Sequence, residues 1–214
     1  MAHWFNAGGS RRQVMSRRER SQVWQSAVVN GLLVAAMWVL ELVDTALGGA
    51  LDLLGIRPRD PDSLASILVA PWLHVDWQHL ISNSVPFFLL GFFILGDSWR
   101  EWLTAIAAAI LASGLAVWLF SAPGSLTIGA SGIVFGWFGY LGLRGFLSRN
   151  TQQIVISVLV LILYGGMLAG LLPGQAGISW QGHLGGLAGG LAAAWWLHRR
   201  SRRRLTARAA PRNW

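Results

Sequence analysis

The sequence predicts an all-α polytopic membrane protein, folded as a bundle of six transmembrane helices, and three observations lead to this fold class. Of the 214 residues, 54% are hydrophobic and only 12% are charged, whereas about a quarter of the residues in a typical soluble domain are charged. The apolar residues gather in six blocks, each approaching the ~20 residues that a helix needs to cross a bilayer. The basic residues, 17 in all and every one an arginine, cluster before the first block and after the last.

The six expected spans divide the chain into three regions. A basic segment, 1–22, precedes the first span and is either disordered or a short surface helix. The first block is too long for the apolar part of a signal peptide and lacks a clear cleavage site, so it is expected to be retained as a span. The membrane domain covers 23–198 and a basic tail covers 199–214. The spans are expected at residues 23–47, 79–95, 102–120, 131–147, 154–172 and 183–197.

The arginine distribution predicts the orientation of these spans. With the N-terminus inside, 15 arginines fall in cytoplasmic segments, and only Arg57 and Arg59 fall outside, in a long loop from about residue 48 to 78. Cytoplasmic loops of membrane proteins carry an excess of basic residues. The sequence therefore predicts a multi-pass protein of a bacterial-type cell membrane with both termini in the cytoplasm. The same placement beside spans argues against binding of nucleic acid and for contact with membrane lipids.

Four polar residues inside the expected spans are candidates for function: His79, Asn83, Ser131 and His183. Polar groups within a bilayer cost free energy unless they are partnered, so they are rare and often functional. Measured from the charged inner end of each span, Asn83, Ser131 and His183 lie at similar heights of roughly 20 to 27 Å, on a rise of about 1.5 Å per residue. His79 lies one turn above Asn83 on the same helix face.

Glycines flank Ser131 and His183. Gly129 and Gly132 surround the serine, and Gly182, Gly186 and Gly190 repeat every four residues beside the histidine. Small residues let two membrane helices approach closely. Such a stripe alone indicates only ordinary helix packing, but together with a serine and a histidine at one height it favours a contact between the fourth and sixth spans.

This pair has the residue types of a nucleophile and its base. A serine hydroxyl needs a base to accept its proton, and imidazole titrates near neutrality. No Asp or Glu follows Glu101, so the prediction is a Ser–His dyad without an acid. Phe135, one turn after the serine, either stacks on His183 or packs in the core. The backbone N–H of Ser131 is the first expected donor to an oxyanion.

The side chains of Asn83 and His79 are two further expected oxyanion donors. Alone, each has a simpler explanation: Asn83 would link two helices, and His79 would lie at the membrane interface. Their height beside Ser131 favours the functional interpretation. The chain has no cysteine and no zinc-binding H-E-x-x-H motif, which excludes a thiolate metal site and that class of zinc protease.

These motifs resemble the rhomboid family of intramembrane serine proteases. The family pattern of a His four residues before an Asn, then G-x-S-G, then H-x-x-G-x-x-x-G matches His79 to Asn83, Gly129 to Gly132, and His183 to Gly190. The resemblance implies a six-helix rhomboid-like bundle, a Ser–His dyad, oxyanion donors on the second helix, and cleavage of transmembrane protein substrates near the outer membrane face without a metal or cofactor. Recognition of small or helix-breaking substrate residues is also implied.

The resemblance extends to His74, for which the family implies a structural role, and it has two departures. Phe135 stands where characterised members often carry a tyrosine, which keeps the ring but removes the hydroxyl. The Trp–Arg pair that many members carry in the first external loop is absent from that loop, and Trp99–Arg100 follows the second span instead.

Two other functions remain as alternatives. A catalytically inactive rhomboid-like protein would bind membrane clients without cutting them, and such a protein is expected to lack Ser131 or His183, whereas both are present. A small transporter would use His79, Asn83 and His183 to line a polar route. Proton-coupled transport usually needs intramembrane acids, and the cores of the second to sixth expected spans contain none.

Overall fold

The computed structural model describes residues 16–209, and its regular structure there is helical apart from an isolated bridge between Ile56 and Thr127. Each of the six predicted spans lies in a helix. These helices are α1 (Arg17–Ala46), α3 (Trp77–Asp97), α4 (Trp99–Phe120), α5 (Ser131–Ser148), α6 (Thr151–Tyr164), which continues as the 3-10 helix η4 (Gly165–Leu171), and α7 (Trp180–Ala209). Four short elements fill the first long loop: η1 (Asp52–Leu54), η2 (Pro61–Ser63), α2 (Ser66–Val69) and η3 (Ala70–Trp72).

Four of these helical segments, α1, α3, α4 and α6 with η4, are each long and apolar enough to cross a membrane. The other two predicted spans, α5 and α7, are rich in glycine, and α5 also contains Arg144. The chain is therefore an all-helical, multi-pass integral membrane protein. Several helices extend beyond the predicted spans; α1 begins at Arg17, and α7 continues past residue 198 into the arginine-rich segment. Residues 1–15 of the predicted N-terminal segment, and 210–214, lie outside the described residues.

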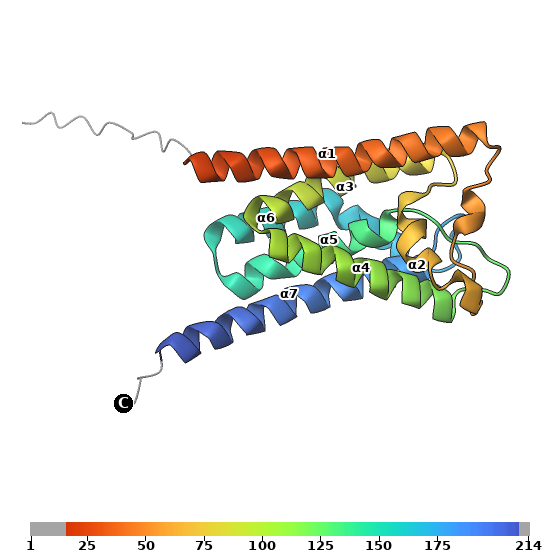
Figure 1. Ribbon diagram of the computed structural model, residues 1–214. Coiled ribbons are helices and arrows are strands. Elements are labelled where there is room, and N and C mark those ends of the chain that lie inside the picture. Colours follow the sequence, from red (N-terminus) through yellow and green to blue (C-terminus); the bar gives the residue numbers. More distant parts are fainter. Residues whose placement is uncertain (1–15, 210–214) are drawn as a thin grey trace, which may run out of the picture.

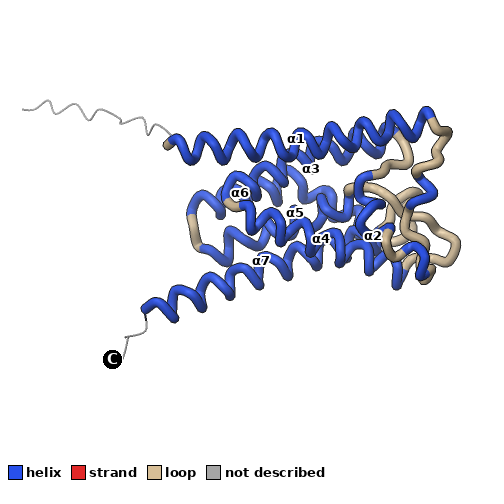
Figure 2. The backbone as a smooth tube through the Cα atoms, in the orientation of Figure 1, coloured by secondary structure: helices blue, strands red, loops and turns tan. Residues whose placement is uncertain are grey.

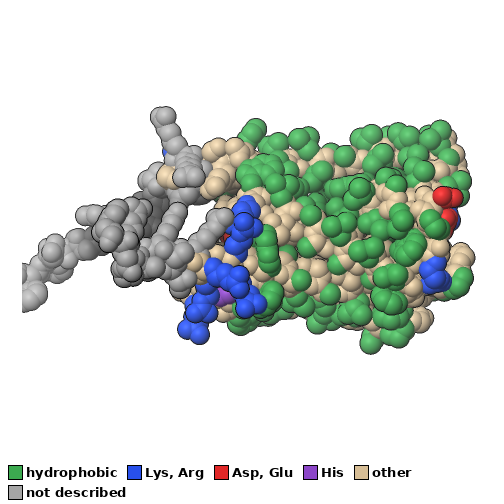
Figure 3. All heavy atoms as spheres, turned by 60° about the horizontal axis from the view of Figure 1, so that its bottom comes forward, with side chains coloured by type: hydrophobic (Ala, Val, Ile, Leu, Met, Phe, Trp, Pro, Cys, Tyr) green, Lys and Arg blue, Asp and Glu red, His purple; other side chains and the backbone are tan. Residues whose placement is uncertain are grey.

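The helices form a bundle around α5, which is buried along almost its whole length (Figure 1). Helix α1 packs on α3 at one edge, α7 packs on α4 and α5 at the opposite edge, and α6 packs on α5. The start of α1 and the end of α7 lie at the same end of the bundle, and the three longer connections lie at the other end (Figure 2). Hydrophobic side chains cover the middle of the surface, whereas charged side chains lie at the two ends (Figure 3), as expected for a bilayer-spanning bundle.

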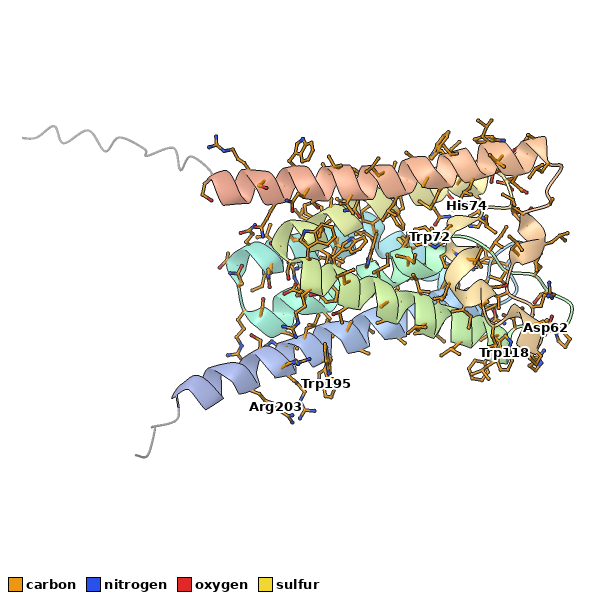
Figure 4. The ribbon with its side chains drawn as sticks, viewed as in Figure 1. Asp62, Trp72, His74, Trp118, Trp195 and Arg203 are labelled. Atoms are coloured by element: carbon orange, nitrogen blue, oxygen red, sulfur yellow. The ribbon has the colours of Figure 1, made fainter. Side chains whose placement is uncertain are left out.

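The first long loop is fastened to the end of α4 by an arginine and a tryptophan. The guanidinium of Arg59 donates to the carbonyl oxygens of Leu119 and Ser121, each at 3.0 Å. In return, the indole N–H of Trp118 donates to the carbonyl of Asp60 at 2.9 Å. The sequence did not predict this arrangement, because Arg59 and Trp118 are far apart in the chain and bond to backbone carbonyls. It fixes the loop that lies beside the start of α5 (Trp118 and His74 are labelled in Figure 4).

Arg144 differs most from its expected environment. It is one of the 15 arginines expected in cytoplasmic segments, and in the structure it is buried near the end of α5, with 6% exposure. It forms ion pairs with Asp97 at the end of α3 and with Glu101 in the first turn of α4, the latter at 3.1 Å. The hydroxyl of Tyr140 also donates to Glu101 at 2.6 Å. The ion pairs provide the partners that a buried guanidinium requires, and they link three helices at one end of the bundle.

Candidate active site

The site is built on a seam where α5 and α7 meet backbone to backbone. A Cβ added to Gly186 would lie 2.1 Å from the carbonyl oxygen of Gly132, and one added to Gly190 would lie 1.7 Å from that of Gly136. These distances are far inside van der Waals contact, so only glycine fits on the α7 side. The small-residue stripe thus brings the two helices together and sets the distance between the side chains at their adjoining ends.

At the loop end of this seam, Ser131 and His183 contact each other directly. His183 Nε2 lies 2.9 Å from Ser131 Oγ, and His183 Nδ1 lies 2.9 Å from the carbonyl oxygen of Gly170. A carbonyl oxygen can only accept, so Nδ1 carries the proton and donates it to Gly170. Nε2 is then left with a lone pair that can accept the proton of the serine hydroxyl. Because of this contact with Gly170, the pair has an orienting group for its imidazole without an acid.

The imidazole of His183 is also held from its face. The Phe135 ring stacks on it with 4.1 Å between ring centroids and 12° between planes. The sequence left two positions open for the Phe135 ring, stacked on His183 or packed in the core, and in the structure it stacks on His183. A Cβ on Gly170 would lie 3.0 Å from His183 Nδ1 and 3.3 Å from Phe135 Cζ. The histidine ring is consequently confined between an aromatic ring, a serine and the backbone of η4.

The backbone N–H of Ser131 is available at the start of α5. Ser131 is the first residue of the helix, and the bonds that close its first turn begin with the N–H groups of Ile133 and Val134, both to Ala130. Helix N-termini leave their first N–H groups without intrahelical partners and favour negative charge. An oxygen anion formed next to Ser131 would therefore meet a donor that is already in position.

His79 and Asn83 line the same cleft as Ser131 and His183, a hollow of about 600 Å³. The Asn83 amide donates to the carbonyl of His79 at 2.9 Å, which leaves its second amide hydrogen for another acceptor. Within residues 16–209, neither Asn83 nor the ring of His79 hydrogen-bonds to the Ser131–His183 pair. The structure brings all four residues to one cleft. Among these four, the side chain of Ser131 hydrogen-bonds to His183 alone.

The N-cap residue Asp76 fixes the start of α3, the helix that carries His79 and Asn83. The side chain of Asp76 accepts a hydrogen bond from the backbone N–H of His79 at 2.7 Å, which starts the helix at this point. Gly129 fits against the His79 ring: its φ is +121°, and a Cβ there would lie 2.5 Å from His79 Cε1. A side chain at Gly129 would therefore both strain the backbone and displace His79.

His74 supports the turn that precedes the serine. It is buried at 2% exposure, and its Nε2 accepts a hydrogen bond from the backbone N–H of Ala130 at 3.4 Å. Its ring also meets that of His79 edge to face, with centroids 5.2 Å apart. Burial, aided by the nearby His79, lowers the pKa of His74 to about 3, so its ring is neutral at physiological pH. A neutral ring can accept the Ala130 N–H.

The Gly170 carbonyl, which orients His183, was not predicted from the sequence. It is a backbone atom of η4, the segment that follows α6, so no side-chain motif marks it. A weak signal was present in the sequence, because Gly165, Gly166 and Gly170 interrupt the end of an otherwise apolar block. Among the described residues, no group of three or more His, Cys, Asp or Glu side chains has the geometry to hold a metal ion.

Comparison with known proteins gives consistent similarities. A family model described as the Rhomboid domain matches residues 61–200. An uncharacterized protein of Mycobacterium tuberculosis is 42% identical over 174 residues, which cover 77% of this chain and 72% of the relative. An uncharacterized protein of Mycobacterium bovis matches with the same values. One of Mycobacterium leprae is 38% identical over 172 residues, covering 77% of this chain and 68% of its own.

Proposed function

The chain belongs to the rhomboid family, and we propose that it is an intramembrane serine endopeptidase that cleaves transmembrane protein substrates near the outer membrane face. The observation that carries this proposal is the 2.9 Å hydrogen bond between His183 Nε2 and Ser131 Oγ. The distance lies within the range in which a base can take the proton of a nucleophile. The tautomer set by Gly170 leaves the correct nitrogen facing the serine.

The chemistry follows from these positions. Ser131 Oγ attacks the scissile carbonyl while its proton passes to His183 Nε2, and the new C–O bond places negative charge on the carbonyl oxygen. The Ser131 N–H and the side chains of Asn83 and His79 stabilise this oxyanion. His183 then gives the proton to the leaving amine, and an ester joins Ser131 to the substrate. A water molecule then gives a proton to His183 and attacks the ester carbonyl; the C–O bond to Ser131 breaks, and His183 returns the proton to Ser131 Oγ.

The position of the cleft supports a membrane-embedded substrate. Ser131 and His183 lie at the loop end of the bundle, level with Asn83 on α3, and hydrophobic side chains cover the surrounding helices. The loop end is the outer side if the arginine distribution sets the orientation. The two arginines of that side are both engaged locally: Arg57 pairs with Asp60 at 2.6 Å, and Arg59 donates to carbonyls of α4 and the loop after it. Both termini are then cytoplasmic.

Labelling with a fluorophosphonate serine probe tests the proposal. The purified full-length chain should be labelled at Ser131 and should cut a reporter that contains a transmembrane segment. Ser131→Ala should lose both reactions, and His183→Ala should lose cleavage while it still folds. Ser125→Ala is the matched control, because this loop serine lines the same cleft and hydrogen-bonds only to the carbonyl of Ala122.

Two results would contradict the proposal. Labelling or cleavage by Ser131→Ala at the wild-type rate would remove Ser131 as the nucleophile. A folded wild-type chain that binds the reporter, yet neither reacts with the probe nor cuts the reporter, would favour the client-binding alternative.

A further inference from the structure

The face formed by α4 and α7 carries an apolar groove at the end of α7 that is distant from the cleft. Four alanines and two tryptophans line the groove, together with Leu103 and Thr104; these six residues are Ala107, Ala108, Ala192, Ala193, Trp195 and Trp196. The hollow is open along the bundle surface and has a volume of about 700 Å³. Ala192 follows His183 by nine residues on α7, or about 14 Å along the helix, and the groove shares no lining residue with the cleft.

A basic hollow continues from this groove. Trp195 and Trp196 line both, and the second hollow is completed by Arg199, Arg200 and Arg203. The arginine side chains gather at this end of the surface in Figure 3, and Trp195 and Arg203 project from the same side of α7, away from the bundle, in Figure 4. Among the described residues, no carboxylate lines either hollow. An apolar slot and a positive pocket thus meet at a pair of aromatic rings.

The arginines are held in place by these rings. Arg199 lies over the ring of Trp195 at 4.5 Å, and Arg200 lies over that of Trp196 at 5.1 Å. Arg100 of α4 approaches the same Trp196 ring at 6.0 Å. A guanidinium stacked by its face keeps its N–H groups along its edge, where they can donate in pairs to a phosphate. These cation–π contacts therefore hold Arg199 and Arg200 next to the groove.

We propose that this groove and basic hollow bind one anionic diacyl phospholipid. An acyl chain would lie along the four alanines of the groove, and the phosphate would lie at Arg199 and Arg200. The chemistry of the two hollows matches the two parts of such a lipid, and tryptophan side chains favour the level where headgroups meet acyl chains. A zwitterionic lipid would bring an ammonium group toward the arginines. A helix of another protein, or of a second copy, would fill the groove but would bring no phosphate to the guanidinium groups of Arg199 and Arg200.

Native mass spectrometry of the full chain in a neutral detergent measures this binding. Phosphatidylglycerol and phosphatidylcholine with identical acyl chains are compared as added ligands. The wild-type chain should bind the anionic lipid at least 10-fold more tightly. The Arg199→Gln/Arg200→Gln variant should lose about 30-fold in affinity for it, since each basic residue near anionic lipid contributes roughly a factor of five.

A charge-matched control separates a built site from general attraction. Arg20 and Arg149 are exposed, and Arg20→Gln/Arg149→Gln removes the same charge outside the site. It should keep the preference for the anionic lipid. Equal loss in both double variants, or equal binding of the two lipids by the wild type, would overturn the proposal. So would displacement of the lipid by an equal concentration of inorganic phosphate, because the acyl chain would then contribute nothing.

A second arm tests the groove without changing charge. Ala107 is exposed, so Ala107→Phe fills the slot from its open side. The control is Ala36→Phe, at an exposed alanine of α1. The groove variant should bind phosphatidylglycerol at least 10-fold more weakly than the control does. Unchanged lipid binding by Ala107→Phe would show that the lipid lies elsewhere. A change in the oligomeric state of this variant, with no change in lipid binding, would favour a second copy of the chain as the occupant.

Discussion

Replacing Gly186 with alanine should open the contact between Ser131 and His183. The new Cβ would lie 2.1 Å from the carbonyl oxygen of Gly132, whereas a carbon meets a carbonyl oxygen at about 3.3 Å or more. The clash is with backbone, so α5 and α7 must separate by roughly 1.2 Å to restore that contact. The Ser131–His183 distance, 2.9 Å in the structure, would grow by a similar amount and exceed the range of a hydrogen bond.

The expected cost is a fall in kcat of about 100-fold, because a misplacement near 1 Å can reduce a rate by that factor. Cleavage of a transmembrane reporter and the rate of fluorophosphonate labelling would both report it. Gly96→Ala in α3 is the matched control, since a Cβ there meets nothing within 4 Å. The control should keep its activity. A folded Gly186→Ala variant with activity within about 3-fold of wild type would refute the proposed role of the seam in holding the pair.

The remaining predictions concern residues around this pair. Asn83→Ala should lower kcat by about 10- to 100-fold, less than Ser131→Ala, because the Ser131 N–H still stabilises the oxyanion; an unchanged rate in the same assay would remove Asn83 from the site. Phe135→Tyr should keep the stacked ring and its activity, whereas Phe135→Ala should lose up to about 10-fold, because ring pairs contribute about 0.5–1.5 kcal/mol. For His74 the folded-state pKa of about 3 lies below the unfolded value, so the unfolded chain binds more protons between these values. Stability should therefore fall by up to about 1.4 kcal/mol per pH unit below roughly pH 6.5. Thermal unfolding of His74→Gln between pH 7 and pH 4.5 should show a flatter dependence than wild type, and equal slopes would contradict this origin.

Much of the fold was predictable from the sequence, because bilayer thickness and helical rise constrain it strongly. The six apolar blocks correspond to helices, and counting from the charged ends placed Asn83, Ser131 and His183 at one level. The glycine repeats also indicated which helices approach. Apolar blocks and glycine spacing are patterns along the chain, so they can be recognised without knowing which distant residues are in contact.

Contacts that depend on the backbone of another element were not predictable. The Gly170 carbonyl and the Ala130 N–H are present in every peptide unit, so nothing in the residue types selects them as partners of His183 and His74. The ion pairs of Arg144 are a different case. An arginine within an apolar block requires an acidic partner, and Asp97 and Glu101 were the acids nearest the same membrane surface, so this pairing could have been deduced.

The hydrogen bond between His183 and Gly170 makes the orientation of the proposed base, the His183 imidazole, depend on η4. Helix α6, which leads into η4, packs mainly on α5, and most of its surface faces outward. If this helix swings away to admit a polypeptide from the side, the carbonyl of Gly170 leaves with it and the imidazole loses its anchor. The bundle could then not be open to the substrate and have an oriented His183 imidazole at the same time. In the proposed reaction, bond cleavage would require α6 to return to its position against α5.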